Sequence, residues 1–408
     1  MSDGLDDVVA AHTVLSEVAG AAGRLVIRGH SLAELAGRTS FEEMAALMFD
    51  GLLPGLPQSN ELQAALGKAR ADLFGIVERT ALSADLGPVE AIRAWTAQIA
   101  DAEGADTALK LLASPAVFTA AAVRKQRGLA PIAPDPALSQ AADTLRMLRG
   151  EVPTPAQAAA LDTYLVTVAD HGLNASTFAA RVVASTRAGL VSAVLAGISA
   201  LKGPLHGGAP GPVIEMLDAI GEPANARAWL EGALDRGERL MGFGHRIYRV
   251  RDPRADALKQ AIAKLGADAG RLRHAEAVEQ AALAILRERK PGRSLETNVE
   301  FYTALLLEAL GFPPEAFTCV FALGRTTGWL AHAREQIETG RLIRPQSVYV
   351  GPSRGRRLEA LVMLGLDPSI SGRRRADGRL LVMRFSGLRF ASPENDALDQ
   401  VSSVSRTA

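Results

Sequence analysis

Helical periodicity is the feature that most constrains the fold of this 408-residue chain. Thr154 followed by Pro155 has the form of a helix N-cap and a first helical residue. Apolar side chains then recur at helical spacing, at Leu161, Tyr164, Leu165 and Val168. The segment 296–310 has the same period, whereas strand-like alternation is scarce and is best developed at 25–28. The sequence therefore predicts the all-α fold class.

Asn174 predicts the start of a further helix, because asparagine is a favoured N-cap residue. The segment that follows is apolar around much of its circumference, at Phe178, Val182, Val183, Leu190, Val194, Leu195 and Ile198. A helix of this kind is buried in a large core or in a subunit interface. We expect one helix that continues to Ile198.

Two breaks rich in glycine and proline divide the helical pattern, at 203–212 and at 311–314. They predict a smaller domain inserted into a larger one. We expect the large domain at 1–207 and 313–356, the small domain at 208–312, and a poorly ordered tail at 357–408.

The composition excludes several classes of partner. Lys plus Arg and Asp plus Glu are both 45, which argues against bulk attraction to nucleic acid or to an anionic membrane. Cys319 is the one cysteine, so an internal disulfide or a site of several thiolates is impossible. The acidic start of the sequence lacks a signal-peptide pattern. We expect a cytoplasmic protein that binds neither nucleic acid nor membrane.

His206 lies in the glycine-rich run 203–209, just before a segment at 212–217 that predicts a helix. The positive end of that helix dipole would lower the pKa of the histidine and favour the neutral imidazole. A neutral imidazole can polarise a carbonyl oxygen by donating a hydrogen bond. The same pattern also fits a histidine that only caps a turn.

His245 lies between glycines in the run 241–248, and Arg249 and Arg254 follow it. Guanidinium groups match the geometry of carboxylates and phosphates. The run therefore predicts acid–base chemistry on an anionic substrate. A solvated basic face is the structural alternative.

Glu300 stands on a largely apolar helix, where partial burial would raise its pKa and suit it to act as a base. A paired or surface glutamate is the alternative. Arg325 and Arg344 complete the set, and each could be structural if considered alone.

No metal or nucleotide motif accompanies these residues. The seven histidines include no His-Glu-x-x-His pair and no pairing with cysteines, so we expect no metal site. A phosphate-binding loop with Gly-Lys-Ser/Thr is also absent from the sequence. Gly242-x-Gly244 alone is too weak to indicate a dinucleotide fold.

Taken together, these motifs are similar to those of the citrate synthases and occur in the same order. The matching runs are 23–29, 40–43, 170–176, 203–209, 241–246, 252–254, 298–302 and 328–332. The resemblance covers about residues 4–356. The chain closely resembles the short bacterial and archaeal forms, including the citrate/2-methylcitrate synthase subgroup.

The resemblance implies an all-α homodimer with a large and a small domain in each chain. It implies condensation of oxaloacetate with acetyl-CoA, then thioester hydrolysis to citrate and CoA, without a metal, in the tricarboxylic acid cycle. By position, His206 would stabilise the acetyl-CoA enolate and His245 would activate the oxaloacetate carbonyl. Glu300 would remove the methyl proton.

The resemblance also implies the binding residues. His171, Arg254 and Arg325 match oxaloacetate ligands, and Arg344 matches an arginine contributed by the other subunit. The CoA site would include Arg249 and the backbone of Met241, Gly242 and Gly244.

Two departures from the family pattern leave alternatives open. Most of the family has aspartate at the position of Glu300, and Pro210 replaces a common asparagine. A misplacement of ~1 Å costs on the order of 100-fold in rate. One alternative is a 2-methylcitrate synthase that uses propionyl-CoA. The other is a catalytically weak paralogue with a binding or regulatory role.

Overall fold

The computed structural model describes residues 4–5, 8–83, 85–207, 211–244, 248, 250–266, 269–293 and 295–351. The chain divides into two units, Met1–Ile343 and Arg344–Ala408. All the helices and strands below belong to the first unit. The tail expected at 357–408 lies outside the described residues.

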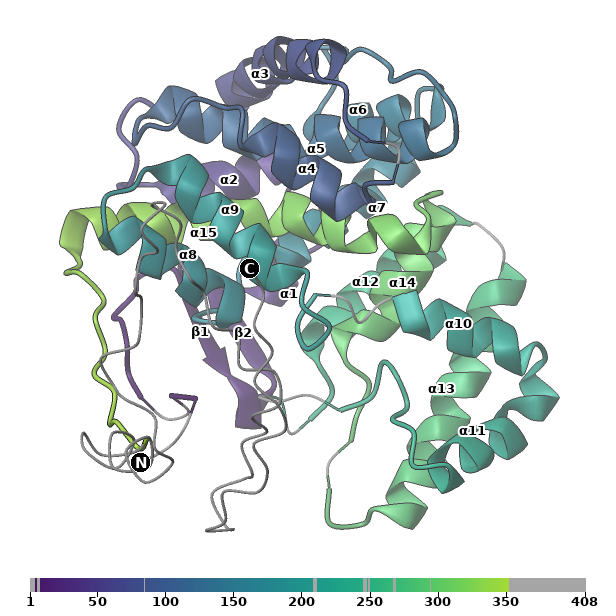
Figure 1. The fold of residues 1–408 in the computed structure, drawn as a ribbon. Coiled ribbons are helices and arrows are strands. Elements are labelled where there is room, and N and C mark those ends of the chain that lie inside the picture. Colours follow the sequence, from purple (N-terminus) through teal and green to yellow (C-terminus); the bar gives the residue numbers. More distant parts are fainter. Residues whose placement is uncertain are drawn as a thin grey trace, which may run out of the picture. The chain divides into compact units, whose positions relative to one another are not determined.

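The first unit is built from helices, which confirms the predicted fold class (Figure 1). The first nine helices are α1 Leu32–Leu35, α2 Phe41–Phe49, α3 Ser59–Arg79, α4 Pro88–Thr96, α5 Ala105–Gln126, α6 Gln140–Arg149, α7 Pro155–Val168, α8 Ala175–Ser185 and α9 Leu190–Leu201. The others are α10 Gly211–Ile220, α11 Ala226–Asp235, α12 Pro253–Leu265, α13 Ala269–Arg289, α14 Val299–Ala309 and α15 Phe317–Thr339. Short 3₁₀ turns lie at Gly20–Ala22, Pro223–Asn225 and Pro314–Ala316.

A small antiparallel sheet near the N-terminus accompanies the helices. Its strands are β1 Ser16–Ala19, β2 Arg24–Ile27 and β3 His30–Ser31, in that order. Ser16 pairs with Ile27, and Val26 pairs with Ser31. The strand predicted at 25–28 is therefore confirmed as β2, although Arg28 leaves it with a φ of +49°.

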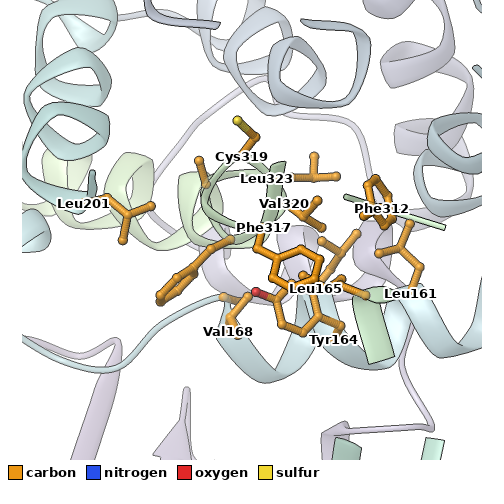
Figure 2. Packing of buried hydrophobic residues seen from close by; sticks show 14 of the residues in the cluster. Leu161, Tyr164, Leu165, Val168, Leu201, Phe312, Phe317, Cys319, Val320 and Leu323 are labelled. Atoms are coloured by element: carbon orange, nitrogen blue, oxygen red, sulfur yellow. The ribbon is translucent and has the colours of Figure 1, made fainter. Parts of the chain in front are cut away.

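Helix α15 forms the centre of the core, where it packs against α5, α7, α8 and α9 (Figure 1). Figure 2 shows side chains of α7, among them Tyr164 and Leu165, beside Phe317 and Val320 of α15. Gly324 allows the close approach of the two helices, since a Cβ atom there would lie 2.9 Å from the Leu165 carbonyl oxygen. The end of α7 is thus held against the middle of α15.

The predicted start of α7 is confirmed, because Thr154 and Gln157 form a reciprocal capping box ahead of Pro155. The single helix predicted from Asn174 to Ile198 is wrong. Asn174 does cap α8, but Arg187 and Gly189 have φ values of +63° and +99° and separate α8 from α9. The Asp101 carboxylate then accepts hydrogen bonds from two backbone amides in the first turn of α9.

The predicted helix at 296–310 begins later, at Val299, because the Asn298 side chain caps it by accepting from the Glu300 amide at 3.0 Å. Helix α5 is long and apolar enough to cross a bilayer, but 83% of its apolar window is buried inside the fold. This burial is typical of a core helix in a globular unit.

Candidate active site

The turn after α7 presents His171 beside the small sheet. Arg325 Nε donates to the Val168 carbonyl at 2.6 Å, and the Gly328 amide donates to the Ala169 carbonyl at 3.1 Å. These bonds tie the turn to α15. The His171 side chain is buried, and its Nε2 lies 3.1 Å from the Tyr248 hydroxyl.

His206 lies in the turn that follows α9. Its amide donates to the Gly203 carbonyl at 2.9 Å, and its Nε2 lies 2.8 Å from the Ser176 hydroxyl. Burial, with a smaller contribution from the positive charge of Arg325, lowers the pKa of His206 to about 4. The predicted direction is confirmed, but its causes are burial and an arginine rather than the helix end.

The loop at 241–244 runs antiparallel to the segment 296–298 that precedes α14. The Gly244 amide donates to the Glu296 carbonyl at 2.7 Å, and the Asn298 amide donates to the Gly242 carbonyl at 3.0 Å. Gly242 has a φ of +85°, and a Cβ atom there would lie 2.8 Å from the Phe301 ring. The loop is therefore fixed directly against the first turn of α14.

Glu300 occupies that first turn, with its side chain half-buried. Burial raises the pKa of Glu300 to about 7; Arg254 and Arg325 oppose this rise, and Asp252 adds to it. The predicted rise is confirmed. A carboxyl group that titrates near neutrality is suited to act as a general base.

Arg254 begins α12 and is 4% exposed. Its guanidinium group donates to both Asp252 oxygens, from Nε to Oδ1 at 3.0 Å and from Nη2 to Oδ2 at 2.8 Å. Burial would lower the pKa of Arg254, but the Asp252 carboxylate raises it overall. The arginine stays charged in the interior.

Arg325 comes from the middle of α15 and is 1% exposed. Burial lowers its pKa to about 10, still well above neutrality. Its charge acts on both His206 and Glu300. Three of the predicted site residues, from α14, α15 and the turn after α9, are therefore electrostatically coupled.

The structure gives less information on the other predicted site residues. His245 and Arg249 lie outside the described residues. Arg344 is exposed and belongs to the second unit. Met241 lines a surface hollow together with Pro212, Met216 and Trp229. Among the described residues, no cluster of three or more His, Cys, Asp or Glu side chains could hold a metal ion.

The family model for the C-terminal domain of citrate synthase matches residues 4–346 of this chain. The chain belongs to the citrate synthase family. Putative citrate synthase 2 of Mycobacterium tuberculosis is 41% identical over 86% of this chain and 92% of that protein. The 2-methylcitrate synthase of the same organism is 37% identical over 85% of this chain and 90% of that protein.

A solved citrate synthase has the same fold. The ternary complex of carboxymethyl coenzyme A and oxaloacetate with citrate synthase from Thermoplasma acidophilum has a TM-score of 0.76. It is 29% identical to this chain and is matched over 97% of its length, against 87% of this chain. Citrate synthases are acyltransferases, and this family member is an enzyme of that type.

Sequence reasoning assigned no role to Ser176, Asp252 or Tyr248, although each lies in or beside a quoted motif. Asp252 carried a signal, because aspartate before Pro253 is a typical helix N-cap, and it does accept from the Arg254 amide. Ser176 and Tyr248 carried none. Their contacts with His206 and His171 join residues 30 and 77 positions apart.

Proposed function

We propose that this chain condenses oxaloacetate with acetyl-CoA to give citrate and CoA, as a citrate synthase of the tricarboxylic acid cycle. The observation that carries the proposal is the pairing of a base with a neutral imidazole near one buried cation. Glu300 has a pKa of about 7, His206 has a pKa of about 4, and both are influenced by Arg325.

Glu300 removes a proton from the acetyl methyl group in the proposed first step. A thioester methyl is a weak acid, so the enolate oxygen needs a hydrogen-bond donor as the proton leaves. His206 supplies that donor. At neutral pH its imidazole is uncharged, which suits donation to an oxygen that gains negative charge.

Ser176 fixes the tautomer of His206 in this proposal. Its hydroxyl accepts from Trp329 Nε1 at 3.1 Å, donates to Asn174 Oδ1 at 2.8 Å and lies 2.8 Å from His206 Nε2. Asn174 Oδ1 already accepts from two backbone amides. In the reacting complex the hydroxyl proton turns from Asn174 Oδ1 to Nε2, which leaves the ring proton on Nδ1 for donation to the enolate.

Oxaloacetate carries two carboxylates, and cationic groups balance them. Arg254, Arg325 and His171 bind the two carboxylates in the proposed site, and the two arginines balance their charge. His245 donates to the ketone oxygen, which becomes an alkoxide as the enolate carbon attacks the ketone carbon. Water then hydrolyses the citryl thioester and releases CoA. The backbone of Met241, Gly242 and Gly244, with Arg249, contacts CoA.

The site is completed by a second copy of the chain in this proposal, with Arg344 reaching the neighbour's oxaloacetate. The small domain, 208–312, closes on the large domain, 1–207 and 313–356, and excludes water before condensation. Mixing Arg344→Ala dimers with His245→Ala dimers tests the sharing. A mixed dimer keeps one site free of both lesions, so subunit exchange restores about a quarter of the activity. Verified exchange without recovery contradicts a shared site.

Release of the CoA thiol is the test of the reaction. We expect release from acetyl-CoA that depends on oxaloacetate and persists in the presence of a metal chelator. Faster release from propionyl-CoA would favour 2-methylcitrate synthesis, the activity named for the 37% identical relative. If folded protein releases no CoA above the oxaloacetate-free control, the result would favour a catalytically weak paralogue with a binding or regulatory role.

The enzyme is proposed to act in the cytoplasm, without nucleic acid or membrane partners. Its balanced charge and its buried, unpaired Cys319 support this location.

A further inference from the structure

A ring of buried hydrogen bonds and ion pairs joins the N-terminal segment to the turn that carries His171. The ring passes through Ser16 of β1, Asp170 in the turn after α7, His332 and Glu335 of α15, and Arg181 of α8. The proposed reaction assigns no role to any of these residues. All except Ser16 are at most 5% exposed in their side chains.

Asp170 and Ser16 hold the peptide on both sides of His171. The Ser16 hydroxyl donates to Asp170 Oδ2. The Gly172 amide donates to Ser16 Oγ at 3.1 Å and to Asp170 Oδ2 at 3.3 Å. The residue before His171 and the residue after it are therefore tied to one serine.

Strand β1 also packs directly on this turn. Gly172 has a φ of +61°, and a Cβ atom there would lie 3.4 Å from Val18 Cγ2 and 4.0 Å from Ser16 Oγ. The strand itself is anchored, because the Arg28 amide donates to the Leu15 carbonyl at 2.8 Å and Ser16 pairs with Ile27. The contact is thus part of the folded sheet.

His332 supports the other oxygen of Asp170. Arg181 Nε donates to His332 Nδ1 at 3.0 Å, so the ring proton of a neutral His332 is on Nε2. That nitrogen lies 3.2 Å from Asp170 Oδ1. Arg181 pairs in turn with Glu335, which accepts from the Val14 amide at 2.8 Å and closes the ring at the N-terminal segment.

We propose that Ser16, Asp170 and His332 are positioning residues for His171, so that the N-terminal strand forms part of the oxaloacetate site. The inference rests on the proposed function, in which His171 binds oxaloacetate. Glu300 and His206 are not in the ring. Loss of a ring bond therefore weakens oxaloacetate binding and leaves removal of the methyl proton largely intact.

Ser16→Ala, measured in the full-length dimer, tests this inference. We expect the KM for oxaloacetate and its calorimetric Kd to rise about tenfold, the equivalent of one lost hydrogen bond to a charged group. The kcat and the KM for acetyl-CoA change less than twofold. Ser16→Thr keeps the hydroxyl and restores the wild-type KM.

Three further variants separate positioning from general stability. Ser83→Ala removes a hydroxyl that contacts Asp85 in an exposed loop, and it leaves all constants unchanged. His332→Leu removes both polar ring atoms, so we expect it to raise the KM and Kd for oxaloacetate selectively, as Ser16→Ala does. His332→Gln keeps a donor toward Asp170 and an acceptor for Arg181, so it raises these constants less than His332→Leu.

The outcomes distinguish this inference from the function on which it rests. Wild-type protein that binds no oxaloacetate in calorimetry would refute both. A His171→Ala variant with a raised Kd, beside a folded Ser16→Ala variant with wild-type Kd, would overturn the positioning role alone. Equal losses in all constants for Ser16→Ala would assign the ring to stability and also overturn it.

Discussion

The Asp252 carboxylate accepts a hydrogen bond at 3.2 Å from the backbone amide of Val299, the residue that precedes Glu300. The same carboxylate binds Arg254 through both of its oxygens. One side chain therefore fixes Arg254, a proposed oxaloacetate ligand, relative to the proposed base. Its negative charge also adds to the rise in the pKa of Glu300.

Asp252→Asn should alter both partners. The amide removes the charge that partners buried Arg254, so we expect the KM for oxaloacetate to rise about tenfold. It also removes a negative charge near Glu300, so the pKa of the base falls and the activity extends to lower pH. The pH profile of kcat/KM for acetyl-CoA measures this shift. Asp256→Asn, on the same helix and more exposed, is the control; an unshifted profile for Asp252→Asn would count against the coupling.

Gly242→Ala should damage the site through its backbone. The new methyl group would meet the Phe301 ring at 2.8 Å, on a residue whose φ is +85°. We expect kcat to fall and the melting temperature to drop by several degrees. Gly266→Ala separates the two causes, because Gly266 has a φ of +62° but nothing within 4 Å. Equal effects of the two substitutions would mean that contact with Phe301 is unimportant.

Local signals in the sequence predicted those helices whose capping or helix-breaking residues lie next to the apolar repeat. Thr154 with Gln157, and Asn298 before α14, cap the helices whose periodicity was evident. The break between α8 and α9 escaped prediction, because it depends on Arg187 at positive φ and on Asp101, which lies 90 residues before the amide that it caps. Apolar periodicity continues across that break.

Prediction of the candidate site from the sequence was limited in the same way. The motifs predicted His206 and Glu300 and the directions of their pKa shifts, but only for Glu300 did the predicted cause, burial, match the structure. The bonds that orient them did not follow. Ser176 of α8 reaches His206 only when α8 packs on α9, and His332 of α15 reaches Asp170 only when α15 packs on α7. Such partners are set by tertiary contacts rather than by spacing along the chain.

Asp162 should make stability depend on pH. Burial raises its pKa to about 7 from an ordinary value of 3.8, and nearby Glu42 adds to the rise. Between these values the folded protein binds more protons than the unfolded chain, so stability falls as pH rises from about 4 to about 7. Asp162→Asn still offers an oxygen to the Phe41 amide. We expect a higher melting temperature than wild type at pH 8 and little difference at pH 4. Asp106→Asn, an exposed control, should show no such dependence, and a matching gain there would refute the assignment.

Glu300→Gln should keep oxaloacetate binding and lose turnover. The amide has nearly the same size as the carboxylate but cannot accept the methyl proton, while Arg254 and Arg325 remain in place. We expect kcat to fall about 10³-fold, within the range for loss of a general base. Glu308→Gln, on the same helix but paired with Arg271, is the matched control and should retain full activity.

The wild-type pH profile and isotope exchange complete this prediction for Glu300. The carboxyl group works as a base only when ionised, so kcat/KM for acetyl-CoA should rise with pH around a midpoint of about 7. His206, with a pKa of about 4, stays neutral throughout that range. Glu300→Asp should retain partial activity, because it keeps the base but shortens its reach. Deuterium exchange into the acetyl methyl group, with an unreactive oxaloacetate analogue bound, reports proton removal without condensation. Exchange at the wild-type rate in Glu300→Gln would place the base on another residue.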